Sequence, residues 1–146
     1  MGGEILRKME ERDLESVLTI QDNLGFQHWS RNQFLQEIGD DRGSLSLVME
    51  NGIIYGYAIF KIMADEAELF SIAVRRESQR SGFGRRLLLQ GLEVLQSRRI
   101  NRVFLEVREG NSAAQSLYRS VAFHPAGLRK RYYPDGENAL LMAWFQ

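Results

Sequence analysis

The chain has 146 residues and 44% of them are hydrophobic, enough for the core of an ordinary domain, so we expect a single domain over residues 1–146. Its 19 basic and 19 acidic residues cancel, so nucleic acid is not an expected partner, and the absence of cysteine excludes disulfides, thiolate metal sites and cysteine nucleophiles. No apolar run approaches the ~20 residues that span a bilayer, so we expect a cytoplasmic protein without a membrane partner.

The first quarter of the chain predicts an edge strand and two helices. Residues 4–9 alternate weakly between polar and apolar, and residues 11–24 have an apolar helical face that Gly25 terminates. Ser30, followed three residues later by Gln33, predicts a capping box at the start of the second helix.

An antiparallel meander of three strands is expected next. The dipeptide Asn51-Gly52 is typical of a hairpin turn, and Gly56 within the following apolar run indicates a bulge. The three strands cover residues 45–49, 53–63 and 67–74. The last of them leads directly into the most informative stretch of the chain.

A glycine-bearing turn, Gln79 to Gly84, joins the meander to a helix over residues 83–98. In this order of strand, glycine turn and helix, free backbone N–H groups and the positive end of the helix come together. This arrangement favours the binding of phosphate. Arginine makes up 16 of the 19 basic residues, and its planar fork suits phosphate oxygens. Five arginines flank or line the turn: Arg75, Arg76, Arg80, Arg85 and Arg86.

Two structural interpretations of this turn stay open. It lacks the Gly-Lys-Ser/Thr ending of nucleotide-triphosphate loops and the third glycine of a dinucleotide fingerprint. A tight turn before a helix and a solvated charged face therefore also fit the pattern.

The second half of the chain predicts a strand, a helix and two further strands. Residues 103–108 form a strand that lies parallel to residues 67–74, because a helix connects the two. Ser112 with Gln115 predicts a helix that starts with a capping box. The last strands cover residues 123–131 and 139–145. The order β-α-α-β-β-β-α-β-α-β-β predicts an α/β protein with a mixed α+β sheet.

Glu106 lies inside an apolar strand, where an ionised carboxylate is costly unless it is solvated or paired. Alternation puts it on one face of the strand with Phe104 and Arg108. The functional interpretation is a general base that acts near neutral pH. The alternatives are an ion pair with Arg108 and simple exposure at a sheet edge.

Asn111 and Tyr118 are seven positions apart, about two helical turns, so both can face the end of the preceding strand. Tyr118 on an apolar helix face is either a core residue or a proton donor. The two histidines, His28 and His124, share no ligand spacing, so no metal site is expected.

Two further segments are candidates for an acceptor site. The aromatic residues between Phe26 and Phe34 suit either the core or the wall of a substrate groove. The stretch Lys130 to Tyr133 mixes basic and aromatic side chains. With zero net charge it favours a peptide or small molecule over nucleic acid, and a solvated hairpin end fits equally well.

Together these motifs resemble the GNAT superfamily of N-acetyltransferases over nearly the whole chain, and within it the bacterial ribosomal-protein-alanine N-acetyltransferase branch. The turn Gln/Arg-x-x-Gly-x-Gly/Ala is shared by the whole superfamily. The joint match to the branch is more specific and covers Leu69–Val74, Leu105–Asn111, Ala114–Tyr118, and Arg129–Tyr133 with Asp135-Gly136.

The resemblance implies acetyl-CoA as the acetyl donor and a role for each matching residue. Glu106 would accept the proton of the acceptor amine, and Tyr118 would protonate the leaving thiolate. Backbone groups of the strand would pair with the pantetheine arm, and the turn would hold the pyrophosphate. The implied cofactor-binding residues are Ile72, Ala73, Val74, Arg80, Ser81, Gly82, Phe83, Gly84, Arg85 and Asn111.

The acceptor implied by the resemblance is the N-terminal α-amine of a protein or peptide, with a ribosomal protein as the expected case. Transfer would occur by direct attack in a ternary complex, without a metal. Three positions depart from the branch: His28 and Arg76 stand where it usually has proline, and Ala122 where it usually has glycine. Because His28 lies in the acceptor region, two alternatives stay open: acetylation of a small-molecule amine or lysine side chain, and a non-enzymatic module that binds coenzyme A or RNA.

Overall fold

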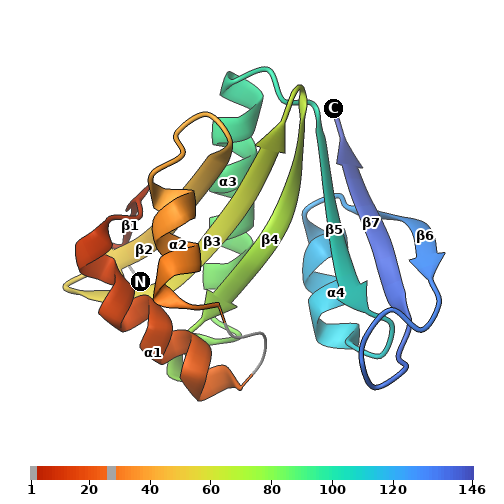
Figure 1. Cartoon of the computed structure of the whole chain (residues 1–146), viewed down its shortest axis with the longest axis horizontal. Coiled ribbons are helices and arrows are strands. Elements are labelled where there is room, and N and C mark those ends of the chain that lie inside the picture. Colours follow the sequence, from red (N-terminus) through yellow and green to blue (C-terminus); the bar gives the residue numbers. More distant parts are fainter. Residues whose placement is uncertain (1–2, 26–28) are drawn as a thin grey trace.

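The computed structural model describes residues 3–25 and 29–146, which form a mixed sheet flanked by helices (Figure 1). The strands are β1 Ile5–Lys8, β2 Ser44–Asn51, β3 Ile53–Met63, β4 Glu66–Val74, β5 Arg102–Arg108, β6 His124–Arg129 and β7 Ala139–Phe145. The α-helices are α1 Leu14–Leu24, α2 Arg31–Ile38, α3 Phe83–Ser97 and α4 Ser112–Ser120.

The seven strands lie in the order β1-β2-β3-β4-β5-β7-β6. Every neighbouring pair is antiparallel except β4 and β5, which are parallel, as the helix between them predicts. The final strand, β7, inserts between β5 and β6, so the last hairpin folds back along β5. The predicted mixed α+β class and order of elements are confirmed.

Local sequence signals account for the two N-terminal helices. The Ser30 hydroxyl accepts from the Gln33 N–H at 3.2 Å and the Gln33 side chain accepts from the Ser30 N–H at 2.7 Å, which confirms the predicted capping box. Gly25 terminates α1 in the left-handed region, with φ of +71°. The helix expected over residues 11–24 starts instead with a 3-10 turn, Glu11–Asp13.

Two hydrophobic cores lie on opposite faces of the sheet. The larger packs the sheet against α3 and α4 and includes Leu87 and Leu105. The smaller packs the sheet against α1 and α2 and includes Val17, Phe34 and Tyr57. Side chains along a central strand therefore alternate between two differently covered faces.

The strand β4 has a bulge at its centre. Its pairing with β3 shifts register around Phe70, which is an extra residue in β4. On the other side, β5 pairs with β4 only along Glu66–Glu68, and beyond this point the two strands diverge (Figure 1). The second half of β4 therefore has no partner strand on its β5 side.

The start of α4 differs from the prediction. Asn111, and not Ser112, is the N-cap, and its Oδ1 accepts from the Ala114 N–H at 3.1 Å. Gln115 does not close a capping box, because its Nε2 donates to two carbonyl oxygens of the preceding turn at 3.1 and 2.7 Å. Asparagine caps a helix as well as serine does, so the adjacent Asn-Ser pair made the predicted cap wrong by one residue.

Candidate active site

The backbone of β4 beyond the bulge has an open hydrogen-bonding edge. The Arg75 N–H donates to the Tyr55 carbonyl on β3 at 2.8 Å, and the register keeps Ala73 paired with β3. Because backbone groups alternate along a strand, those of Ile72 and Val74 point towards β5, which no longer pairs with β4. This edge can accept an extended ligand as an additional strand. All three predicted strand residues have register partners in β3, and Ala73 is the one whose backbone groups point towards β3 instead of the open edge.

The glycine turn has a backbone suited to an anion. Arg80 and Gly82 adopt left-handed conformations, with φ of +62° and +87°, and Gly82 is the N-cap of α3. Gln79 Nε2 donates to the Val74 carbonyl at 3.0 Å and fastens the turn to the end of β4. Successive N–H groups in such a turn point to one side and form an anion-binding concavity at the helix N-terminus. The turn therefore fits a diphosphate.

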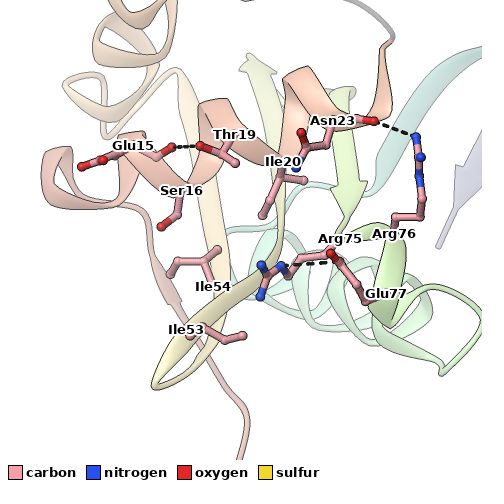
Figure 2. A pocket seen from close by; sticks show the side chains of 10 residues that line it. All are labelled: Glu15, Ser16, Thr19, Ile20, Asn23, Ile53, Ile54, Arg75, Arg76 and Glu77. Atoms are coloured by element: carbon pink, nitrogen blue, oxygen red, sulfur yellow. Dashed lines mark hydrogen bonds and ion pairs between the residues drawn. The ribbon is translucent and has the colours of Figure 1, made fainter.

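Three of the five arginines near the turn point elsewhere. Arg86 of α3 pairs with Glu4 at 3.0 Å. Arg75 and Arg76 turn towards α1, where Arg76 Nη2 donates to the Asn23 carbonyl at 2.7 Å (Figure 2). Of the five arginines that flank or line the turn, these three therefore have partners within the protein, and the partner of Arg75 is Glu77 at 3.8 Å.

Arg80 and Arg85 make no ion pair within residues 3–25 and 29–146, and both are exposed. No acidic residue lies in the first turn of α3. Cations at a helix N-terminus oppose the helix dipole, so these two arginines are unfavourable there unless an anion binds. Their position supports the diphosphate assignment.

A pocket of ≈ 260 Å³ lies between α1, the β2–β3 hairpin and the segment after β4 (Figure 2). Its lining is mixed and includes Thr19, Ile53 and Glu77. None of the predicted catalytic or cofactor-binding residues lines it, so it is separate from the site predicted from the sequence.

Glu106 lies on the face of β5 turned away from the core beneath α3 and α4. Its neighbours Leu105 and Val107 are buried in that core, whereas the Glu106 side chain is 15% exposed. Glu106 Oε1 is 3.6 Å from Arg129 Nε on β6, and Oε2 is buried without a hydrogen-bond partner among the described residues. A buried unpartnered carboxylate oxygen is costly, so this atom is available to a proton or donor brought by a ligand.

Arg108 is not the partner of Glu106. Its Nη1 bonds to Asp135 and to Glu137, each at 2.9 Å, and its guanidinium lies 4.1 Å from the Tyr133 ring centroid. The alternative of a Glu106–Arg108 ion pair is therefore wrong. Simple exposure is also wrong, because the Glu106 side chain is only 15% exposed. Arg108 instead holds the β6–β7 connection in place.

Tyr118 is a core residue with an available hydroxyl. It is 8% exposed, and its ring centroid lies 6.0 Å from that of Phe123. Its hydroxyl has no hydrogen-bond partner within the described part of the chain. Burial, with a smaller contribution from Tyr133, raises the pKa of Tyr118 to about 12. The phenol is therefore protonated at neutral pH, as a proton donor must be.

The β6–β7 connection relates Glu106 to Tyr118. Burial and then the Glu106 charge raise the pKa of Tyr133. Tyr133 in turn contributes to the raised pKa of Tyr118. The interaction with the Glu106 carboxylate also raises the pKa of the exposed Tyr132. Glu106 and Tyr118 thus come from opposite faces of the sheet and share Tyr133 as a common neighbour.

Asn111 is exposed at the N-terminus of α4. Its Oδ1 is used in the helix cap, which leaves its amide NH₂ group to donate to a ligand. The capping role is a second reason for this residue type at this position, beside the predicted contact with the cofactor.

Within the predicted acceptor segment, Trp29 is held between α1 and β4. The buried Gln21 side chain of α1 donates to the Trp29 carbonyl at 2.9 Å and accepts from the Trp29 N–H at 2.8 Å. The Trp29 ring packs edge-on against Phe70, the bulge residue of β4, at 6.2 Å between centroids. Phe26 and His28 of the predicted acceptor segment lie outside the described residues. Gln21 and Phe70 together fix the described end of this segment against β4.

Residues 5–123 match the Acetyltransferase (GNAT) family, which is well over half of the chain. The chain belongs to the GNAT acetyltransferase family. As a member of this family it is an acetyl-CoA-dependent acetyltransferase. The resemblance noted in its sequence is thereby confirmed.

Named relatives of this GNAT protein match along its length. The ribosomal protein bS18-alanine N-acetyltransferase of Escherichia coli (strain K12) is 37% identical over 94% of this chain and 95% of its own length. The Haemophilus influenzae enzyme of the same name is 35% identical, over 97% and 98%. A crystal structure of the Escherichia coli enzyme has a TM-score of 0.88 at 35% identity, covering 97% of this chain and 93% of that one.

The contacts of Gln21, Phe70 and Arg129 around the candidate site were not predicted from the sequence. Gln21 is a polar residue on an otherwise apolar helix face, which was the available signal for a buried clamp. The consecutive apolar residues Leu69 and Phe70 break the two-residue period of the strand, which was the signal for the bulge. No sequence signal connected Arg129 with Glu106, because the two residues meet only through the pairing of β6, β7 and β5.

Within residues 3–25 and 29–146 of this acetyltransferase, no cluster of three or more His, Asp or Glu is arranged to hold a metal ion. His124 is exposed at the start of β6. No helix in the described ranges is both long and apolar enough to cross a membrane.

Proposed function

We propose that this protein transfers the acetyl group of acetyl-CoA to the N-terminal α-amine of a protein in the cytoplasm, with a ribosomal protein as acceptor. The observation that carries the proposal is the divergence of β4 and β5 beside Glu106. It leaves an open strand edge for an extended cofactor next to a carboxylate that can receive a proton. Relatives named for ribosomal-protein alanine acetylation that align over almost the whole chain support this choice of acceptor.

The cofactor contacts follow from the backbone. The open edge consists of the Ile72 N–H and carbonyl and the Val74 N–H, since the Val74 carbonyl accepts from Gln79, and it suits the pantetheine amides. The turn and first helical residues, Arg80, Ser81, Gly82, Phe83, Gly84 and Arg85, suit the pyrophosphate through backbone N–H groups and the helix end. The Asn111 amide can donate to the pantetheine arm. Acetyl-CoA supplies an activated acyl group, and the chain supplies position and proton transfer.

The proposed catalytic roles follow from which groups carry a proton at neutral pH. An α-amine with a pKa of ~8 is mostly protonated at neutral pH and cannot attack until a base removes its proton. Glu106, with one buried unpartnered oxygen, takes that proton directly or through one water. The amine then attacks the acetyl carbonyl directly, and the departing thiolate takes a proton from Tyr118, whose phenol is protonated. No covalent enzyme intermediate is needed.

A panel of acceptors tests the proposal. Release of coenzyme A can be followed with a thiol reagent, because the enzyme contains no cysteine to interfere. We expect release with cysteine-free peptides that have a free α-amine and none with the same peptides after N-terminal blocking. Release only with small amines, or only with blocked peptides that contain lysine, would contradict the proposal.

A further inference from the structure

Glu68 is the last residue of β4 that pairs with β5, where its register partner is Phe104. The bulge at Phe70 follows directly, and the two strands then diverge. Glu68 therefore lies where the strands part.

Glu68 lies on the same face of the sheet as Glu106. Its strand neighbours Ala67 and Leu69 belong to the core beneath α3 and α4, so the half-buried Glu68 side chain points to the opposite face. Glu106 lies two residues beyond the register partner of Glu68 and also faces away from that core. The point of divergence therefore has one carboxylate on each strand, on one face.

These two carboxylates have too little positive charge near them. Burial, and then the negative charge of Glu106, raise the pKa of Glu68, and Arg129 opposes this effect. Arg129 itself is 57% exposed and 3.6 Å from Glu106. Lys61 is opposite Glu68 in the β3 register, but its ammonium pairs with Glu37 at 3.2 Å and lies over the Phe70 ring.

The other groups that face this region add no unpaired positive charge, because the Arg108 guanidinium is paired with Asp135 and Glu137 and the two tyrosines are neutral at pH 7. The hydroxyls of Tyr132 and Tyr133 interact with Glu106, and both have raised pKa values. Two carboxylates with one exposed guanidinium thus leave an excess negative charge on a partly buried surface. Such an arrangement destabilises the unliganded protein and favours the binding of a ligand that brings a positive charge.

We propose that Glu68 is a positioning residue for the acceptor and that, together with Glu106, it holds the protonated amine where β4 and β5 diverge. The inference rests on the proposed function, because the acceptor amine is the cation in question. The ammonium donates to both carboxylates, its proton passes to Glu106, and Glu68 stays ionised throughout. The amine lone pair then forms the C–N bond as the C–S bond breaks, and the thiolate takes its proton from Tyr118.

Steady-state kinetics of Glu68→Gln with an N-terminally free peptide test this role. Removing a charged hydrogen-bond partner should raise the peptide KM at least about 10-fold and leave the acetyl-CoA KM unchanged. The peptide kcat should change much less than the peptide KM, because Glu106 remains in place to accept the proton of the amine. The matched control is Glu66→Gln, on the same strand and face but paired with the exposed Arg102, which should leave both KM values unchanged.

Thermal unfolding separates positioning from a structural role. A carboxyl whose folded-state pKa is raised destabilises the fold as pH rises above its unfolded value of ~4.3. Glu68→Gln should therefore be at least as stable as the parent protein at pH 7. An unchanged peptide KM, or a raised KM together with a lowered unfolding temperature, would overturn the role of Glu68 while leaving the proposed function intact. Parent protein that acetylates no free α-amine would overturn both.

Discussion

The turn at Gln79–Gly84 uses one contiguous stretch of chain, whereas the proposed acceptor face around Glu106 draws on α1, β4, β5 and the β6–β7 connection. The turn offers mainly backbone groups, set by left-handed residues at a helix start. The acceptor face offers side chains, held by contacts between distant segments. Cofactor binding should thus be sensitive to backbone strain, and acceptor binding to side-chain chemistry.

The largest effect is expected for Glu106→Gln, which keeps the shape of the side chain and removes the proton acceptor. The rate with a peptide should fall by roughly 10²–10⁴-fold at pH 7. The loss should shrink above pH ~8, where the amine deprotonates unaided. Binding of acetyl-CoA, measured by calorimetry, should not change. The exposed Glu109→Gln is the control, and a parent-like pH profile in Glu106→Gln would remove the assignment of Glu106 as base.

Gly82→Val tests the backbone on the cofactor side. A β-branched residue at φ of +87° costs about 1–2 kcal/mol, which corresponds to roughly 5–30-fold weaker acetyl-CoA binding if the turn must distort. Gly136→Val introduces the same strain at φ of +88° in the β6–β7 connection. This control should leave the acetyl-CoA Kd unchanged and raise the peptide KM. Parent-like acetyl-CoA binding in Gly82→Val would make the turn structural only.

Gln21→Leu tests the side-chain clamp on the acceptor side. Two buried hydrogen bonds to the Trp29 backbone are lost, so the free energy of unfolding should fall by about 1–3 kcal/mol. The peptide KM should rise and the acetyl-CoA Kd should stay the same. The exposed Gln36→Leu in α2 is the matched control. A change in the acetyl-CoA Kd would show that the two sides are not independent.

The smallest effect is expected for Ala122→Gly, outside both sides of the site. Ala122 has φ of +72°, so glycine should raise the free energy of unfolding by about 0.5–1 kcal/mol, with unchanged activity. Chemical denaturation measures this difference. Ala113→Gly on the exposed side of α4 should instead lower stability by about 1 kcal/mol. Equal shifts in the two variants would contradict the strain at Ala122.

The contrast between the turn and the proposed acceptor face also explains which features could be predicted from the sequence. The turn, the Ser30 capping box and the parallel pairing of β4 with β5 follow from residues close together in the chain. The unusual backbone of Ala122 also agrees with the sequence, because this residue stands where the related branch usually has glycine and its φ is positive. The partner of Glu106 could not be predicted, since Arg129 reaches it only because β7 inserts between β5 and β6.

The partners of two arginines near the turn were hidden for the same reason. Arg86 pairs with Glu4, which is 82 residues away in the chain, and Arg76 donates to the Asn23 carbonyl, which is 53 residues away. Local composition correctly indicated a basic turn, but only the tertiary fold determines which guanidinium groups remain available to a ligand.

The site of acetylation in a single peptide with both a free α-amine and an internal lysine tests the central claim most directly. After incubation with the enzyme and acetyl-CoA, tandem mass spectrometry locates the added acetyl group. The proposed arrangement, in which Glu106 deprotonates an N-terminal amine beside the diverging strands, predicts acetyl on the α-nitrogen alone. Acetyl on the lysine ε-nitrogen, with the α-amine unmodified, would contradict it.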